Sequence, residues 1–156
     1  MSIAAVRTYF SQFGKEDDIL EFPVSSATVE LAAEAVGVIP ARIAKSLSFQ
    51  AGDKTVLIIT SGDAKVNSSK FKKVFHTKPK MLPAEEVEAK IGHDVGGVCP
   101  FALKDGVEVY LDISLQRFDT VFPAAGSSNS AIKLTCAQLE QYSCNFQSWG
   151  DFCKLS

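Results

Sequence analysis

The chain has 156 residues, of which 46% are hydrophobic and 22% charged, and its formal net charge is −2. This composition is typical of a globular protein with a packed core, and it excludes a mainly disordered chain. The longest apolar runs fall far short of the ~20 residues that cross a bilayer, which excludes a membrane span.

The first part of the chain predicts a helix, a short strand and a second helix. Apolar residues recur at helical spacing over Ile3–Phe13, and a glycine follows as a natural stop. Ile19–Phe22 is a strand candidate because it is short, mostly apolar and closed by a proline. Ser25 and Ser26 precede an Ala- and Glu-rich amphipathic helix that ends at a glycine.

A predicted antiparallel hairpin comes next. Its strands are Ile43–Phe49 and Thr55–Thr60, and the tight turn between them contains Gly52 and Asp53. With the period of two that a strand imposes, Lys45 lies in the apolar row of the first strand.

The second half predicts two more helices, three strands and a last helix. Asn67 or Ser68 caps the first of these helices, Pro83 opens the second, and a capping box at Thr135–Gln138 starts the last. The strands are Val107–Leu111, Phe118–Phe122 and Ala131–Leu134. Because strands and helices mix without strict βαβ alternation, we expect a mixed α/β sheet in one domain, residues 1–156.

Lys45 is the first candidate site residue. An ammonium in an apolar row either reaches the edge of the sheet or stays partly buried, and a partly buried cation needs an acceptor or anion to meet it. Two interpretations remain open. Lys45 is either an edge-strand lysine that discourages aggregation, or a site lysine that meets a substrate phosphate, carbonyl or carboxylate.

A glycine-rich loop is the second candidate. The stretch from Ile91 to Phe101 contains Gly92, Gly96 and Gly97 together with Pro100. Such a loop lets the backbone approach a ligand closely and presents amides to an anion or a developing oxyanion. The alternative is an ordinary tight turn.

The third candidate is a lysine-rich segment. Residues 65–80 contain six of the chain's sixteen basic residues, one histidine and no acid. With so small a net charge, binding of nucleic acid must depend on such a local patch. The segment either contacts a phosphate backbone or forms a solvated helix face. Its lysines are Lys65, Lys70, Lys72, Lys73, Lys78 and Lys80.

The cysteines show no C-x-x-C pair and no zinc-finger spacing, and no secretory sequence precedes them. We therefore expect reduced thiols and a cytoplasmic protein. Cys99 follows His93 by six residues, but the spacing shows neither a base within reach of the thiol nor a lowered pKa. Asp112 could orient a lysine, bind a hydroxyl or cap the turn that follows it.

In this order and at this spacing, the motifs resemble the YbaK/EbsC family of aminoacyl-tRNA deacylases, which is related to the editing domain inserted in bacterial prolyl-tRNA synthetases. The resemblance runs from about Thr28 to Leu139. It rests on AKSLSF (Ala44–Phe49), SGDAKVNSSKF (Ser61–Phe71) and GHDVGGVCPF (Gly92–Phe101), followed by VYLDISL and AAGSSNSAIKL.

The resemblance implies a barrel-like mixed sheet surrounded by helices. It also implies hydrolysis of the ester between a wrong amino acid and tRNA, with no covalent intermediate, metal or cofactor. The family's lysine matches Lys45 and its G-x-x-x-P loop matches Gly96 to Pro100, so Lys45, Gly96, Gly97 and Pro100 are the expected catalytic residues. The expected substrate-binding residues are Thr28, Ser46, Val98, Cys99, Phe101, Asp112 and Gly126. The lysines expected to contact tRNA are Lys70, Lys72, Lys73, Lys78 and Lys80.

By resemblance, the expected substrate is a small or polar amino acid, such as Ala, Cys, Ser or Thr, on tRNA(Pro) or a related tRNA. Many relatives carry serine at the position of Cys99, so we expect a different amino-acid pocket here. A synthetase is a further expected partner, whereas a membrane and DNA are not. Two alternatives remain: a non-catalytic tRNA- or synthetase-binding module of the same fold, and a cysteine hydrolase that uses Cys99.

Overall fold

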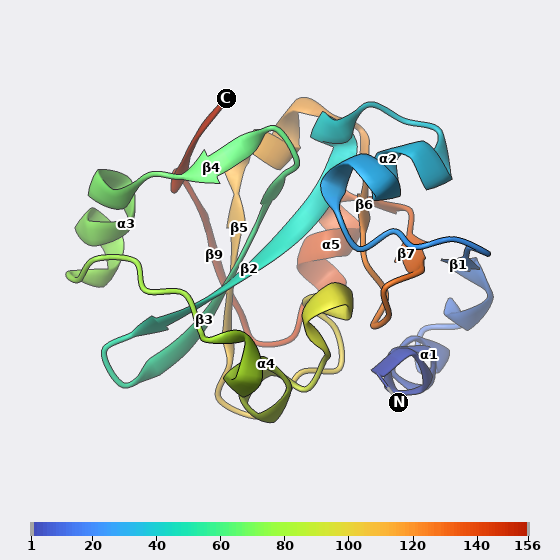
Figure 1. The fold of residues 1–156 in the computed structure, drawn as a ribbon, viewed down its shortest axis with the longest axis horizontal. Coiled ribbons are helices and arrows are strands. Elements are labelled where there is room, and N and C mark those ends of the chain that lie inside the picture. The colour runs from blue at the N-terminus through green and yellow to red at the C-terminus, as the bar shows by residue number, and fades with distance from the viewer. Residues whose placement is uncertain (1, 156) are drawn as a thin grey trace.

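A mixed sheet of six strands forms the centre of the computed structural model, which describes residues 2–155 (Figure 1). Strands β2 and β3 form an antiparallel pair, as do β6 and β8, and the other three neighbouring pairs are parallel. The sheet curls into a half-barrel with helices around it, which confirms the predicted fold class. In sheet order the strands are β8 (Leu134–Thr135), β6 (Thr120–Pro123), β2 (Ile43–Ala51), β3 (Lys54–Ser61), β5 (Glu108–Asp112) and β9 (Phe146–Gly150).

Five α-helices and two short strand pairs complete the described chain. Strand β1 (Ile19–Glu21) pairs with β7 (Ser130–Ile132), and β4 (Ala64–Val66) pairs with β10 (Cys153–Leu155), both antiparallel. The helices are α1 (Ser2–Ser11), α2 (Val29–Val36), α3 (Ser68–Phe75), α4 (Ala84–Ile91) and α5 (Cys136–Tyr142). In Figure 1, α3 and α1 lie at opposite ends of the molecule, and α2 covers one end of β2.

Local sequence explains several of these elements. The predicted hairpin is confirmed, and Gly52 at its turn has φ +64°, a conformation that favours glycine. Asn67 caps α3 by accepting a hydrogen bond from the backbone of Lys70 at 3.0 Å. The predicted capping box of α5 is also present, with Thr135 as the N-cap.

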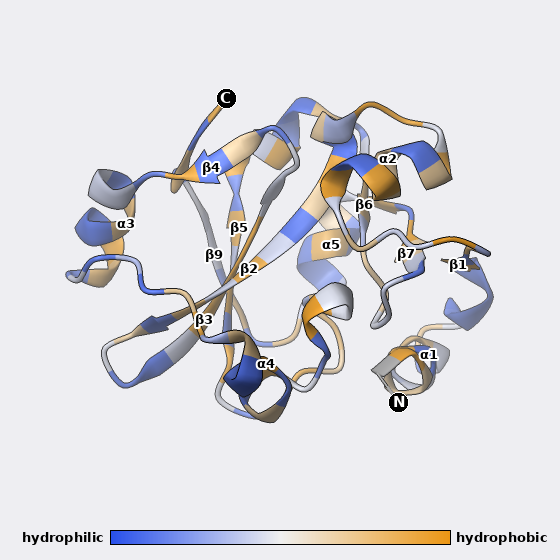
Figure 2. Cartoon of the chain, viewed as in Figure 1, coloured by the Kyte–Doolittle hydropathy of each residue, from blue (hydrophilic) through white to orange (hydrophobic). Residues whose placement is uncertain are grey.

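Strand β3 is buried on both faces, and its residues alternate between two cores. Leu57 and Ile59 belong to the inner core, which packs against α1, α4 and α5. Val56 and Ile58 belong to the outer core, which packs against α3, β4 and β10. Figure 2 shows hydrophilic colour interrupting the hydrophobic colour along β2, which borders the same cores.

All four cysteines are free in the structure. Cys99 is buried in the inner core and Cys153 in the outer core. No helix of the described residues is long and apolar enough to cross a bilayer.

Several boundaries differ from the predictions. The cap of α2 is Thr28, whose hydroxyl accepts from the backbone of Leu31 at 3.1 Å, whereas the backbone N–H of Ser26 donates to Ser128 at 2.6 Å. The segment predicted as the strand Phe118–Phe122 begins at Thr120, because a short helical turn occupies residues 113–117. Strands β4, β9 and β10 were not predicted.

Candidate functional site

A pocket of about 110 Å³ lies where β2 separates from β6. The two strands pair only at Ile43 and Ala44. Farther along, the same edge of β2 pairs with the segment before α4, where the backbone N–H of Gln50 donates to the carbonyl of Lys80 at 2.8 Å. The stretch of β2 between these contacts borders the pocket.

The pocket walls come from separate parts of the sequence. One wall is formed by residues 26–29 and the first turn of α2, and another by residues 43–46 of β2. The one-turn helix Val95–Gly97 and the ends of β6 and β7 close the remaining sides. The fold therefore gathers the Lys45 strand and the glycine loop around one space.

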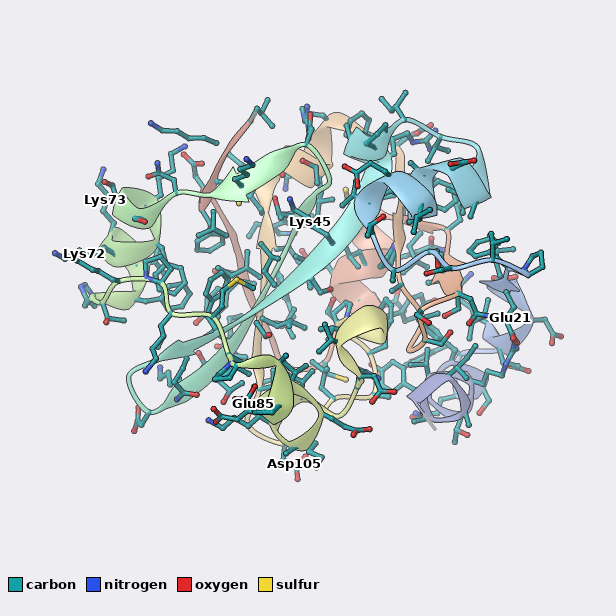
Figure 3. All side chains as sticks on the ribbon, in the orientation of Figure 1. Glu21, Lys45, Lys72, Lys73, Glu85 and Asp105 are labelled. Atoms are coloured by element: carbon teal, nitrogen blue, oxygen red, sulfur yellow. The ribbon has the colours of Figure 1, made fainter. Side chains whose placement is uncertain are left out.

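Lys45 is half-buried at this pocket, and Figure 3 shows it near the middle of the face in view. Burial lowers its pKa, and the neighbouring ammonium of Lys65 lowers it further, while Cys153, Asp63 and Glu30 act in the opposite direction. Within residues 2–155 the ammonium forms no hydrogen bond or ion pair. Strand β2 is an interior strand of the sheet, but its pairing with β6 ends at Ala44, so Lys45 lies directly after the last paired residue.

Ser46 also lines the pocket, next to Lys45 on the same strand. Its hydroxyl oxygen is buried and has no hydrogen-bond partner among the described residues. A buried hydroxyl without a partner is destabilising by roughly 1–3 kcal/mol. A ligand in the pocket that offers a donor or acceptor would satisfy it.

The glycine loop approaches the turn at residues 126–127 backbone to backbone. A methyl group built on Gly97 would come within 2.5 Å of the carbonyl carbon of Gly126, so only glycine fits there. Gly96 faces the pocket, and a methyl on it would lie 3.0 Å from the Cβ of Ser128. The N–H of Gly97 donates to the carbonyl of Asp94 at 2.9 Å. The amide of Gly97 is therefore engaged within the loop itself.

Cys99, Pro100 and Phe101 lie behind the loop and do not line the pocket. The carbonyl of Pro100 accepts from the backbone of Cys144 at 2.8 Å, and the ring of Phe101 packs on Phe10 with centroids 4.7 Å apart. Cys99 and Phe101, expected to bind substrate, thus lie in the inner core, and Pro100, expected to be catalytic, is buried between them.

Cys99 and His93 are close together, which their spacing in the sequence did not show. The thiol sulfur lies 3.5 Å from His93 Nε2, and that nitrogen is 2.6 Å from the carbonyl oxygen of Phe101. Both side chains are fully buried. Burial raises the pKa of the Cys99 thiol to about 12 and lowers the pKa of His93. A neutral, enclosed thiol does not support the cysteine-hydrolase alternative.

Asp112 lies outside the pocket, at the end of β5. Its carboxylate accepts from the backbone of Ser114 at 3.0 Å and of Phe152 at 2.8 Å. The turn-capping interpretation of Asp112 is confirmed, and Asp112 does not line the pocket. Gly126, at φ +95°, packs against Gly97 behind the pocket wall.

Five predicted site residues share the pocket, while its apolar wall was not anticipated. The five are Lys45, Gly96, Thr28, Ser46 and Val98. The wall includes Ala32, Phe122, Ala124 and Ala131. These four are small or apolar residues in segments whose sequence is typical of a packed core, so no sequence pattern identifies them as pocket residues.

The predicted tRNA-contacting lysines divide into two groups. Lys70 is already engaged, because its ammonium contacts Asp151 at 2.8 Å and the carbonyl of Cys153 at 3.0 Å. The other four are exposed and form no ion pair within residues 2–155. They are Lys72, Lys73, Lys78 and Lys80. Figure 3 shows Lys72 and Lys73 at the α3 end of the molecule, away from Lys45.

Comparisons with known proteins show the family of this chain. The model of the aminoacyl-tRNA editing domain family matches residues 24–142. The protein YwhH of Bacillus subtilis (strain 168), itself uncharacterised, is 53% identical over 155 residues, which are 99% of this chain and 98% of that protein. The proline–tRNA ligase of the same strain is 35% identical over 90 residues, 57% of this chain but 16% of the ligase.

A solved structure shows the same fold over nearly the whole chain. It is described as a proposed trans-editing enzyme for prolyl tRNA synthetase, and it superposes with a TM-score of 0.87 at 26% identity. The match covers 98% of this chain and 97% of that chain.

Within residues 2–155, no three His, Cys, Asp or Glu side chains gather in a way that could hold a metal ion.

Proposed function

The chain belongs to the aminoacyl-tRNA editing domain family, and we propose that it is a free-standing deacylase that hydrolyses the ester of mischarged aminoacyl-tRNA. One observation carries this proposal: the fold brings the ammonium of Lys45, which has no partner within residues 2–155, and the backbone of Gly96 to the same small pocket. The first belongs to a strand and the second to a distant loop, so their convergence is a property of the folded chain.

The size of the pocket favours a small acyl group. The pocket measures about 110 Å³, and its apolar wall, which includes Ala32, Phe122, Ala124 and Ala131, suits a small acyl group. We propose Ala, Cys, Ser or Thr as the acyl group, on tRNA(Pro) or a related tRNA, and proline as the amino acid that is spared. A second, smaller site is useful because one methylene changes binding by only ~1–3 kcal/mol.

The proposed chemistry needs no side-chain nucleophile. An aminoacyl ester is already activated, so positioning and stabilisation of the oxyanion can suffice. A water oxygen attacks the carbonyl carbon, the ester C–O bond breaks, and the proton released by the water passes to the leaving ribose oxygen. The Lys45 ammonium would meet the negative charge that develops, and the Ser46 hydroxyl would contact the bound substrate.

The alternative within the same fold is a non-catalytic module that binds tRNA or a synthetase. The match covers only 16% of the ligase, so the activity of the whole ligase is not assigned to this chain. The presence of Lys45 and Gly96 at one pocket favours the deacylase, because a binding module has no need for a desolvated cation beside a small cavity.

A deacylation screen separates the two functions. Purified protein is given tRNA(Pro) charged with Ala, Cys, Ser, Thr or Pro, with and without a chelator, and release of the amino acid is compared with spontaneous hydrolysis. We expect release of one or more of the small amino acids, no acceleration for Pro, and no effect of the chelator. Binding of charged tRNA without accelerated release of any of them would assign the module instead.

A further inference from the structure

Two lysines that the site does not use face each other across the β4–β10 ribbon. Lys65 and Lys154 are direct cross-strand partners in this antiparallel pair. Their neighbours Ala64 and Cys153 are buried in the outer core, so strand alternation turns both lysines outward, and both are exposed. Like charges directly opposite each other destabilise a strand pair. The ribbon therefore carries a repulsion that nothing within it relieves.

The acids near the ribbon are already neutralised by other cations. Arg117 holds Asp63 through two hydrogen bonds, at 2.6 and 3.1 Å. Lys70 holds Asp151 at 2.8 Å. Lys65 and Lys154, in contrast, form no ion pair within the described residues. A local excess of positive charge remains on this surface.

The ribbon lies between the pocket and the lysines of α3. Lys65 is close enough to Lys45 for its charge to affect that ammonium. On the other side, β4 leads within two residues into α3, which carries Lys72 and Lys73. In Figure 3 the β4 strand lies between the labelled Lys45 and these two lysines, whereas the labelled acids Glu85, Asp105 and Glu21 lie along other edges of the molecule.

We propose that the Lys65–Lys154 pair binds the phosphate backbone of the tRNA whose acyl end occupies the pocket. This inference rests on the proposed function, and it adds a tRNA-binding surface on β4 and β10. A phosphate placed between the two ammonium groups turns their repulsion into two attractions. It also releases counterions from the nucleic acid, which makes the binding depend on salt.

The test compares two double variants and one single variant with the wild type. Binding to uncharged tRNA is measured by fluorescence anisotropy over a range of salt concentrations. Lys65→Gln with Lys154→Gln removes both charges, and Lys65→Arg with Lys154→Arg keeps them. Lys104→Gln is the matched control, because Lys104 is an exposed lysine in the turn beside Asp105.

We expect the glutamine pair to weaken binding and to reduce the slope of log Kd against log salt by roughly 0.7–0.9, since the pair contacts one phosphate and each phosphate contact contributes about that amount. The arginine pair and Lys104→Gln should keep the wild-type slope. The melting temperature of the glutamine pair should equal or exceed that of the wild type, because the substitution removes a repulsion. This combination would distinguish a binding surface from a structural contact.

A glutamine pair with the slope and affinity of the wild type would overturn the inference, as would an equal loss in Lys104→Gln. The proposed function fails separately. If the wild type binds tRNA through these lysines but releases no amino acid in the deacylation screen, the binding surface stands and the deacylase does not.

Discussion

Lys45 is a cation beside a cavity and has no hydrogen-bond or ion-pair partner among the residues that the structure describes, which makes its protonation state a measurable property of the site. Burial is the largest cause of its lowered pKa, and Lys65 contributes in the same direction. Because the protonated form predominates only below the pKa, Lys45 should lose its charge at a lower pH than an ordinary lysine.

The first prediction follows from that shift. In wild-type protein, kcat should fall on the alkaline side as Lys45 deprotonates, and Lys65→Gln should move this fall to higher pH because it removes a neighbouring positive charge. Lys45→Ala should lose most activity while keeping the fold, since it removes a cation and little core volume. The measurement is a pH profile of kcat at saturating substrate, corrected for spontaneous hydrolysis. A Lys45→Ala protein that folds and keeps the wild-type rate would remove Lys45 from the site.

The second prediction concerns Cys99, whose thiol is neutral and enclosed. Cys99→Ser should retain deacylation within a few-fold, because the serine hydroxyl can donate to the nearby Phe101 carbonyl as the thiol does. The amino-acid preference can change through small shifts of the loop in front of it. Steady-state rates on the acyl groups of the screen provide the measurement. Loss of activity, together with a thioester trapped on the wild type, would restore the cysteine hydrolase.

At the scale of elements, two adjacent glycines of the glycine loop should respond differently to substitution: Gly97→Ala should mainly reduce stability, and Gly96→Ala should mainly reduce activity. Gly97→Ala drives a methyl into the backbone of Gly126, which should reduce the free energy of unfolding by about 1–3 kcal/mol. Gly96→Ala meets the Cβ of Ser128 at 3.0 Å, a milder contact than the backbone clash at Gly97, and Gly96 borders the pocket. We therefore expect Gly96→Ala to lower kcat/KM with a smaller loss of stability. Urea unfolding and deacylation rates of both variants decide this, and equal stability losses would contradict it.

Helix α3 presents Lys72 and Lys73 in its last turn. If these lysines contact tRNA phosphates, Lys72→Glu with Lys73→Glu should raise KM and leave kcat nearly unchanged, because it removes binding that ground state and transition state share. Lys70 is left out of this variant, since its ion pair with Asp151 supports β10. An unchanged KM and an unchanged salt dependence would make this face of α3 a solvated surface.

For the whole molecule, the C-terminal residues complete both the sheet and the outer core. Strand β9 pairs with β5, β10 pairs with β4, and Phe152 between them is 1% exposed. Deletion of residues 146–156 should abolish cooperative unfolding, because it exposes β5 and empties the centre of the outer core. Deletion of residues 155–156, which removes the 57% exposed Leu155, should cost little stability. Chemical denaturation followed by circular dichroism measures both. A cooperative transition in the longer deletion would refute the prediction.

Whether a structural feature of this chain can be predicted from its sequence depends on how far apart in the sequence the interacting residues are. The β2–β3 hairpin, the Asn67 cap and the Thr135 capping box depend on residues within a few positions of each other, and all three were predictable. Strand β9 joins the sheet by parallel pairing with β5, which no local pattern announces. The ion pair of Lys70 with a residue 81 positions away is non-local in the same way, and it removes a lysine from the predicted tRNA contacts.

The residues of the candidate site also differ in whether the sequence alone could predict their place. Lys45 was predictable because a lysine in an apolar row is anomalous by itself, and Ser46 is its neighbour. Cys99 and Phe101 lie in the same glycine loop as Gly96, but the backbone turns them into the inner core, and sequence alone does not give that direction.

The placement of the free thiols has a consequence for following the motions of this protein. A thiol buried at a raised pKa reacts with a labelling reagent only when its surroundings open. Cys99 lies in the inner core and Cys153 in the outer core, and burial raises the pKa of each thiol to about 12. The chain thus carries one buried native reporter on each face of its sheet. If α3 and β10 detach while the helices on the other face stay packed, Cys153 will be labelled before Cys99, and the order of labelling of these two thiols will show which half of the molecule opens more easily.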